Sequence, residues 1–234
     1  MELVLEIINI IGIISFAAAG AMIAIDKEAD CFGVVFLSLI TCFGGGLLRD
    51  VIAGQAIGRE LPAVFTELKM EIIVCVCTAF VVFLLASIFK EKYVNDEATV
   101  EKINNVLDAL GLGVFASVGT AAYAELGFFV AIFMGFISSV GGSITRDIIL
   151  RDIPLVLRKR VYAIACIIGS AVYYLISDVW MKGQSSADVV ATISCMVVIF
   201  VIRMCATVFR WNIPKAIDFA KIKAKSEEKE DVHI

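Results

Sequence analysis

Charged residues and histidine are scarce in this sequence. Only 19% of the 234 residues are charged and 60% are hydrophobic, and the mean hydropathy of +0.94 lies outside the range of soluble domains. The one histidine, His233, is the second-last residue, which excludes a histidine-based catalytic or metal site in the core. The composition therefore predicts an all-α integral membrane protein.

Other absences exclude further classes of function. The net charge of −4 and the pI near 5.1 give no indication of nucleic-acid binding. The sequence has no nucleophile elbow and no carboxylate cluster with metal-ligand spacing, so we expect no enzyme, no cofactor and no fixed metal. Glu2 and Glu6 stand where a signal peptide would carry Lys or Arg, so we expect the first apolar segment to be retained. The seven cysteines lack metal-site spacing, and we interpret them as small buried hydrophobes.

Long apolar windows dominate what is present. A window of about 20 residues is needed to cross ~30 Å of hydrocarbon as a helix. Seven windows meet this requirement, at about 4–25, 31–53, 70–89, 103–124, 127–150, 161–180 and 187–209. We therefore expect a single transmembrane domain over residues 1–210. Residues 211–234 are strongly charged and are predicted to form a cytoplasmic tail, a short helix that becomes disordered.

The distribution of basic residues predicts the orientation. Outside the apolar windows, counting the connections and the C-terminal tail, 14 basic residues lie on the side of the C-terminus and three on the side of the N-terminus. Basic residues accumulate on the cytoplasmic side, so we expect an N-terminus outside, a cytoplasmic C-terminus and a location in the plasma membrane. The basic run Arg158–Arg160 is explained by topology alone; the alternative is that it binds anionic membrane lipids together with Lys90, Lys92 and Lys102.

The chain contains an internal repeat. Gly12, Phe16 and Gly20 match Gly111, Phe115 and Gly119 at an offset of 99, and 44–50 matches 141–147 at an offset of 97. This arrangement gives three helices over about 4–89, three over about 103–180, and one more over about 187–209. An odd number of spans per copy places the two copies upside down relative to each other, as in the inverted repeats of transporters.

The repeated stretches TCFGGGLLRD (41–50) and SSVGGSITRD (138–147) carry adjacent glycines inside apolar windows. Each glycine weakens a helix by roughly 1 kcal/mol relative to alanine, so we expect helices two and five to be broken there, near the middle of the membrane. Freed carbonyls and nearby hydroxyls would suit an alkali cation or a small zwitterion. The alternative is that the glycines only permit close helix packing. The residues concerned are Thr41, Gly44, Gly45, Gly46, Ser138, Ser139, Gly141, Gly142, Ser143 and Thr145.

Charged residues follow each group of glycines. Neighbouring positions on a helix do not face each other, so we expect Arg49–Asp50 and Arg146–Asp147 to pair with other helices or with freed carbonyls. One hypothesis is that they shape the two mouths of a pathway; the other is that they only stabilise the kinks. Asp108 and Arg203 lie at similar depths in helices four and seven and are predicted to neutralise each other as a structural ion pair.

These motifs resemble one family. Four motifs are similar to those of prokaryotic trimeric intracellular cation (TRIC) channels, a family whose bacterial relatives are also described as glycine-transporter-type membrane proteins. They are F-A-x-x-G-A over 16–21, D-x-F-G over 30–33, T-x-x-G-G-G-x-x-R-D over 41–50 and G-G-S-x-x-R-D over 141–147. The resemblance covers nearly all of residues 5–209. It implies a seven-helix protomer, a homotrimer with one pore per protomer, and permeation by monovalent cations, potassium above all. It assigns the kinks to Gly44, Gly45, Gly46, Gly141 and Gly142; in the second copy Ser143 stands where the first copy has its third glycine, Gly46.

Two transport functions remain open from the sequence. The first is a potassium channel, which needs a continuous polar path. The second is a small amino-acid carrier in which the same glycine sites grip a glycine carboxylate. The absence of an acidic residue among the adjacent glycines disfavours coupling to sodium or protons but leaves a uniporter unaffected.

Overall fold

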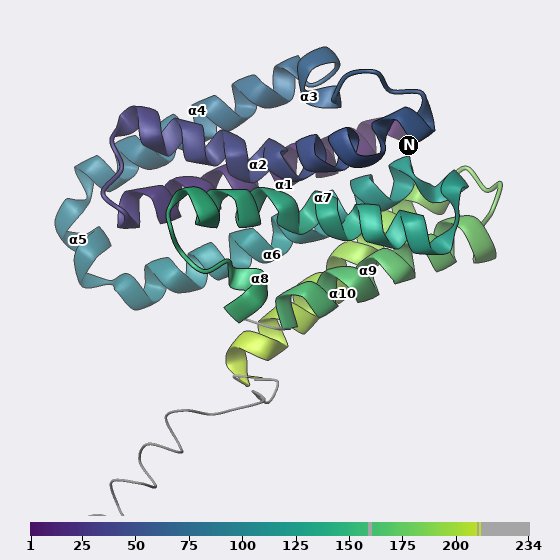
Figure 1. Ribbon diagram of the computed structural model, residues 1–234. Helices are drawn as coiled ribbons and strands as arrows, with labels where there is room; N and C mark the ends of the chain where they lie inside the picture. Colours follow the sequence, from purple (N-terminus) through teal and green to yellow (C-terminus); the bar gives the residue numbers. More distant parts are fainter. Residues whose placement is uncertain (159–160, 210, 212–234) are drawn as a thin grey trace, which may run out of the picture.

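Seven long helices build the protein, as the sequence predicts. Figure 1 shows the computed structural model, which describes residues 1–158, 161–209 and 211. Within these residues, seven helices are long and apolar enough to cross a membrane. They are formed by α1 (Glu2–Asp26), α2 (Cys31–Ala53), α4 (Lys69–Ile88), α6 (Glu97–Ala122), α7 (Phe128–Ile149), α9 (Val161–Tyr174) and α10 (Ala187–Val208). The α9 span reaches its full length, Val161–Trp180, only with the helical turn that follows it. The predicted tail, and Lys159 and Arg160 of the predicted basic cluster, lie outside the described residues.

Short elements connect the long helices at the two ends of the bundle. The end at which α1 begins, here called the N-terminal face, carries η1 (Gly54–Ile57), α3 (Ala63–Thr66) and η2 (Ala124–Leu126). The opposite end, the C-terminal face, carries α5 (Lys90–Asn95) and α8 (Leu155–Arg158). The π-helical stretch η3 (Leu175–Trp180) continues α9 toward the N-terminal face. None of these short elements is predicted from the sequence.

Helices α2 and α7 cross at their adjacent glycines. A Cβ atom on Gly45 would overlap the Ser138 carbonyl oxygen, and one on Gly142 would overlap the carbonyl oxygen of Thr41. A Cβ on Gly44 would lie 3.1 Å from the Cα of Gly142. The two helix backbones are thus in direct contact, which only glycine permits.

Both helices remain α-helical through the glycines, so the predicted break in helices two and five is wrong at the level of secondary structure. Helix α2 runs from Cys31 to Ala53 and α7 from Phe128 to Ile149 without interruption. The physical reason is that a carbonyl released in hydrocarbon needs a new partner, whereas a continuous helix satisfies its own backbone. The structure supports the alternative interpretation, in which the glycines permit close packing.

Helices α1 and α6 repeat this reciprocal contact. Gly12 of α1 packs on Val114, and Gly111 of α6 packs on the ring of Phe16. The rings of Phe16 and Phe115 stack with centroids 5.1 Å apart. The contacts between the two halves of the chain therefore involve matching residues of the internal repeat.

The crossing yields the first testable prediction. Gly45→Ala should lower the thermal unfolding midpoint of the detergent-solubilised protein, because the new methyl group overlaps a backbone carbonyl that cannot move aside; overpacking typically costs about 1–3 kcal/mol. Gly46→Ala is the matched control, since the nearest atom to its Cβ is the Arg49 Nη2 at 3.9 Å. Equal midpoints for the two variants would contradict the close crossing.

Candidate functional site

A cavity opens at the N-terminal face and extends to the α2–α7 crossing. Its volume is about 300 Å³. Its walls come from α1, α2, α3, α4, α6 and α7, and include Glu6, Asn9, Gly46, Arg49, Glu71 and Ser138. We call it the vestibule. It places three carboxylates, those of Glu6, Glu71 and Asp50, around a passage that ends beside the glycines.

The Arg49–Asp50 pair lies at the wall of this vestibule. The Arg49 Nε and Nη2 atoms each lie 2.7 Å from Asp50 Oδ1, and Arg49 Nη1 donates to Ser138 Oγ at 3.3 Å. The guanidinium also lies over the ring of Tyr123, 5.8 Å from its centre. Burial raises the pKa of Tyr123. Arg49 thus links α2 to α7 across the crossing.

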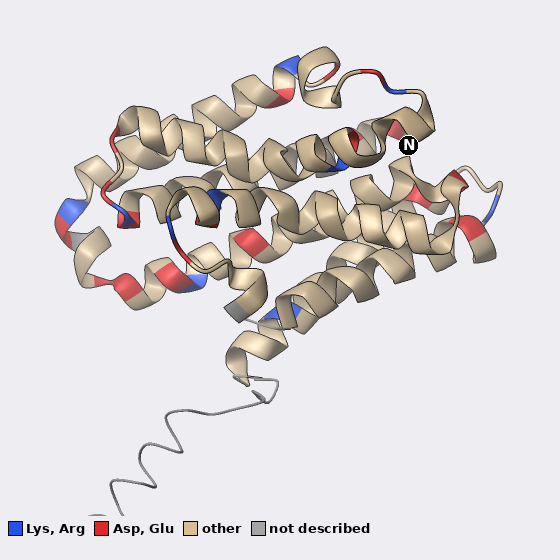
Figure 2. Cartoon of the chain, viewed as in Figure 1, with Lys and Arg blue, Asp and Glu red and all other residues tan. Residues whose placement is uncertain are grey.

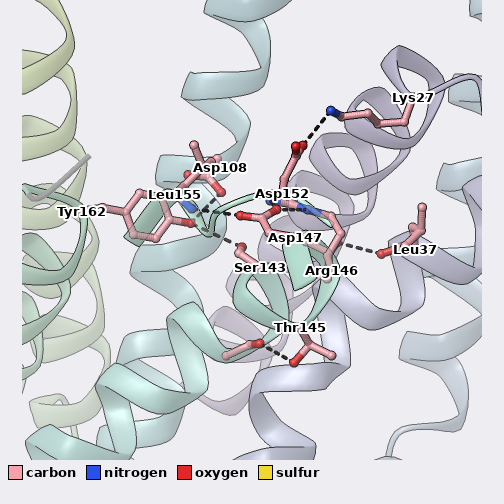
Figure 3. Close-up of polar contacts among 12 residues, drawn as sticks. Lys27, Leu37, Asp108, Ser143, Thr145, Arg146, Asp147, Asp152, Leu155 and Tyr162 are labelled. Carbon is pink, nitrogen blue, oxygen red and sulfur yellow. Dashed lines mark hydrogen bonds and ion pairs between the residues drawn. The ribbon is translucent and has the colours of Figure 1, made fainter. Parts of the chain in front are cut away.

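The second pair has the same form but is closed off. Arg146 Nε and Nη2 donate to Asp147 Oδ1 at 3.0 and 2.7 Å, as Figure 3 shows. The Arg146 side chain is 0% exposed, against 6% for Arg49. The prediction that neighbouring Arg and Asp would not pair with each other is wrong in both copies, because the long arginine side chain can fold back onto the nearest carboxylate, and a buried charge needs a partner.

The second carboxylate oxygen of each aspartate holds a short helix. Asp50 Oδ2 accepts from the backbone N–H of Ala63 at 2.9 Å and from Arg59 Nη1 at 3.1 Å. Asp147 Oδ2 accepts from the N–H of Leu155 at 3.0 Å. The first N–H groups of a helix have no partner within the helix. Asp50 satisfies one at the start of α3, directly after Pro62, and Asp147 satisfies one at the start of α8, directly after Pro154. The motif therefore anchors the chain where it leaves α2 and α7.

The predicted hydroxyls divide into two groups. Thr41, Ser139 and Thr145 donate to carbonyls of their own helices, at 2.7, 2.9 and 2.8 Å. Ser138 and Ser143 instead contact other helices: Ser138 accepts from Arg49, and the Ser143 hydroxyl donates to the hydroxyl oxygen of Tyr162 at 3.3 Å. The structure therefore brings Gly46, Arg49 and Ser138 together at the vestibule, while Gly44, Gly45, Gly141 and Gly142 form the crossing.

The predicted ion pair between Asp108 and Arg203 is present, with Arg203 Nη2 at 3.1 Å from Asp108 Oδ2. Sequence reasoning missed its third member, Tyr162, whose hydroxyl donates to Asp108 Oδ1 at 2.9 Å. The ring of Tyr162 lies under the guanidinium of Arg203, with 4.4 Å from Cζ to the ring centre. A tyrosine inside an apolar window needs a hydrogen-bond partner, and this was the signal available in the sequence.

Acidic side chains gather at the N-terminal face. Figure 2 shows red segments at both ends of the bundle, and at this end few blue ones accompany them. The acidic residues of its loops and helix ends outnumber the basic ones; they are Glu2, Glu6, Glu60, Glu67, Glu71, Glu125, Asp178 and Asp188, against Arg59, Lys69 and Lys182. A surface of one sign concentrates counter-ions. The face that opens to the vestibule therefore favours cations.

This fold and site define a class, a multi-pass membrane protein of the channel and transporter type. The glycine transporter family model matches residues 6–87 and 105–178, and the chain belongs to this family. It is 32% identical over 209 residues to the UPF0126 inner membrane protein YadS of Escherichia coli strain K12, covering 88% of this chain and 92% of YadS.

Solved structures of TRIC cation channels share the fold. One TRIC cation channel, studied for the structural basis of its conductance, superimposes with a TM-score of 0.73 at 30% identity over 91% of this chain and 97% of the other. The TRIC trimeric intracellular cation channel orthologue from Rhodobacter sphaeroides gives a TM-score of 0.72 at 26% identity, covering 89% and 99%. The family expected from the sequence motifs is thereby confirmed.

The ion pair between α6 and α10 gives the second prediction. Asp108→Asn should lower the thermal unfolding midpoint strongly, because it leaves Arg203 buried without a counter-charge; breaking a buried pair costs about 3–5 kcal/mol. Adding Arg203→Gln should recover part of this loss. A double-mutant cycle of unfolding midpoints measures the coupling, and a sum of independent effects would contradict it.

Proposed function

We propose that this protein is a monovalent cation channel, selective for potassium, with one pathway through each protomer of a homotrimer. The observation that carries the proposal is the vestibule, which leads from an acidic face to Gly46 and Ser138 at the α2–α7 crossing. Carboxylates at its mouth raise the local cation concentration, and the Ser138 hydroxyl at its base offers an oxygen ligand that suits a weakly held alkali ion. The TRIC-like fold supports the same conclusion.

The proposed arrangement in the membrane follows from the charge distribution. The acidic N-terminal face lies outside, and the C-terminal face, with Lys27, Lys90 and Arg151, is cytoplasmic. The reciprocal contacts of Gly45 with Ser138 and of Gly142 with Thr41 support two inverted repeats related by an axis through the crossing. Membrane lipids surround the apolar outer surface, and the trimer rests on the resemblance to the channels.

A glycine carrier is the second candidate, and one observation favours it. The vestibule opens at one face. In the second repeat, Asp108 and Ser143, which match Asn9 and Gly46 of the vestibule, are instead hydrogen-bonded to Tyr162. A site accessible from a single side is the arrangement that alternating access requires. Membership of the glycine transporter family points the same way.

The third prediction separates the two candidates. Purified protein in planar bilayers should give stepwise potassium currents, because a channel passes many ions for each opening. In liposomes it should give no saturable uptake of labelled glycine. Gly46→Leu should abolish the currents, since its side chain extends into the vestibule, whereas Gly46→Ala should retain them. Saturable glycine uptake without unitary currents would establish the carrier instead. Assembly of both variants is checked by their elution volume in detergent.

The fourth prediction compares the two arginines. Arg49→Gln should leave the protein folded, because Asp50 keeps Arg59 as its partner, and should raise cation conductance by removing a positive charge from the vestibule wall. Arg146→Gln should instead lower the unfolding midpoint, because Asp147 would lose its buried counter-charge. Wild-type conductance in a folded Arg49→Gln variant would remove Arg49 from the proposed pathway.

A further inference from the structure

A second cavity lies at the N-terminal face, beside the vestibule. Its volume is about 580 Å³, and its walls come from α1, α6, α9, α10 and the short elements η2 and η3. Small-molecule sites usually have volumes of about 300–1,000 Å³. Leu5, Asn9 and Val118 line both cavities and form the wall between them. We call this second space the side cavity; the proposed pathway does not use it.

The side cavity carries acidic groups and no basic one. Glu125, Asp178 and Asp188 line it, whereas no described lysine or arginine does. Tyr173 donates to Asp188 Oδ1 at 3.2 Å, and Ser177 donates to Asp178 Oδ2 at 2.7 Å. None of the three carboxylates forms an ion pair with a residue that the structure describes. An occupant of the side cavity is therefore expected to be a cation.

A buried hydroxyl in this cavity lacks a partner. Thr192 of α10 is 5% exposed and lines the side cavity, and its Oγ1 forms no hydrogen bond within the described part of the chain. The other buried threonines, Thr41 and Thr120, each donate to the carbonyl four residues earlier at 2.7 Å. A buried hydroxyl without a partner is destabilising. The Thr192 hydroxyl is thus available to a ligand in the cavity.

The arrangement favours an extended organic cation over a metal ion. Among the described residues, no three carboxylate, thiol or imidazole side chains are placed to hold one metal ion, so the three carboxylates do not converge on a point. Much of the remaining wall is apolar, with Leu5, Ile8, Val114 and Val118. An inorganic ion gains nothing from apolar walls, whereas a methylene chain is stabilised by burial against them. Ammonium groups joined by a methylene chain match both features.

We propose that the side cavity binds a linear diamine or polyamine. Asp188 and Thr192 lie four residues apart on one face of α10, and they hold one ammonium group through the carboxylate and the free hydroxyl. Asp178 or Glu125 holds another, and the methylene chain packs on the apolar wall. Each ammonium donates several hydrogen bonds, which hydroxyl and carboxylate oxygens accept. This site lies beyond the proposed pathway and does not depend on the proposed function.

Binding is measured by isothermal titration calorimetry on the detergent-solubilised full chain at constant ionic strength, with 1,5-diaminopentane as the probe. Two reference ligands separate its properties: 1-aminopentane has the same chain and one ammonium group, and magnesium chloride supplies two charges without a chain. The diamine should bind on the order of tenfold more tightly than either, because each reference ligand lacks one set of contacts. Equal affinity for the diamine and for either reference ligand would overturn the proposal.

Thr192→Val tests the site without changing its charge. Loss of the hydroxyl should weaken diamine binding on the order of tenfold, because a hydrogen bond to a charged group is lost. Wild-type affinity in this variant, with a raised thermal unfolding midpoint, would show that Thr192 serves packing alone and would overturn the proposal.

Asp188→Asn should weaken binding similarly, and it keeps the test valid if Thr192→Val does not fold, since Asp188 is exposed. Glu60→Gln is the matched control, because it removes the same charge from the N-terminal face outside the side cavity; its affinity should equal that of the parent. Equal weakening by Asp188→Asn and Glu60→Gln would indicate a general surface charge and contradict a defined site.

The shared wall also predicts an effect on transport, and this consequence rests on the proposed function. A bound diammonium places positive charge beside the vestibule, so 1,5-diaminopentane applied at the N-terminal face should lower the potassium current, and less so in Thr192→Val. Diamine binding to a protein that conducts no potassium would keep the site and remove the function. Unchanged affinity in folded Thr192→Val would remove the site, whatever the currents show.

Discussion

The contact of the α2 and α7 backbones is the constraint on which the rest of the structure depends. In hydrocarbon an interrupted helix must find new partners for every released carbonyl, so both helices stay continuous and the glycines serve to bring them together. The close approach fixes where all neighbouring side chains can lie. Arg49 reaches Ser138 of α7 only because no Cβ separates the two helices at Gly45.

The same crossing explains the position of the charged pairs. Arg49–Asp50 and Arg146–Asp147 begin one turn beyond the glycines, where α2 and α7 diverge toward opposite faces. Each aspartate neutralises its arginine and caps a short helix at the membrane boundary. The motif is therefore both an ion pair and an anchor for the connecting chain, which accounts for its repetition together with the prolines that follow it.

Sequence reasoning predicted the large features of the fold and less of the site. Hydropathy was enough to predict the seven helices, because a bilayer requires helices of a certain length and apolar content. The similar depths of two buried charges were enough to predict the Asp108–Arg203 pair, since each needs a counter-charge. Sequence reasoning failed for the glycines, because their helix-weakening tendency was weighed above the cost of freed carbonyls. Asn9 and Glu71 were missed because the vestibule is assembled from six helices whose packing no local pattern encodes. Tyr162 was missed although a tyrosine inside an apolar window already indicates a buried hydrogen-bond partner.

Asymmetry between two similar halves is what allows a repeated structure to have a direction. The crossing itself is nearly symmetric, since Gly45 and Gly142 contact equivalent carbonyls. The difference lies in a few substitutions around it. At the repeat offsets of 97 and 99, Gly46 corresponds to Ser143 and Asn9 to Asp108; at the offset of 91 that matches Cys75 with Cys166, Glu71 corresponds to Tyr162. In the second half a serine hydroxyl replaces the bare glycine, a tyrosine ring replaces the glutamate, and an ionisable carboxyl replaces the neutral amide. Arg203 then supplies a counter-charge from the helix that has no counterpart. The additional seventh helix thus acts on only one of the two halves, which makes one end of the crossing a closed polar cluster and the other an open acidic cavity.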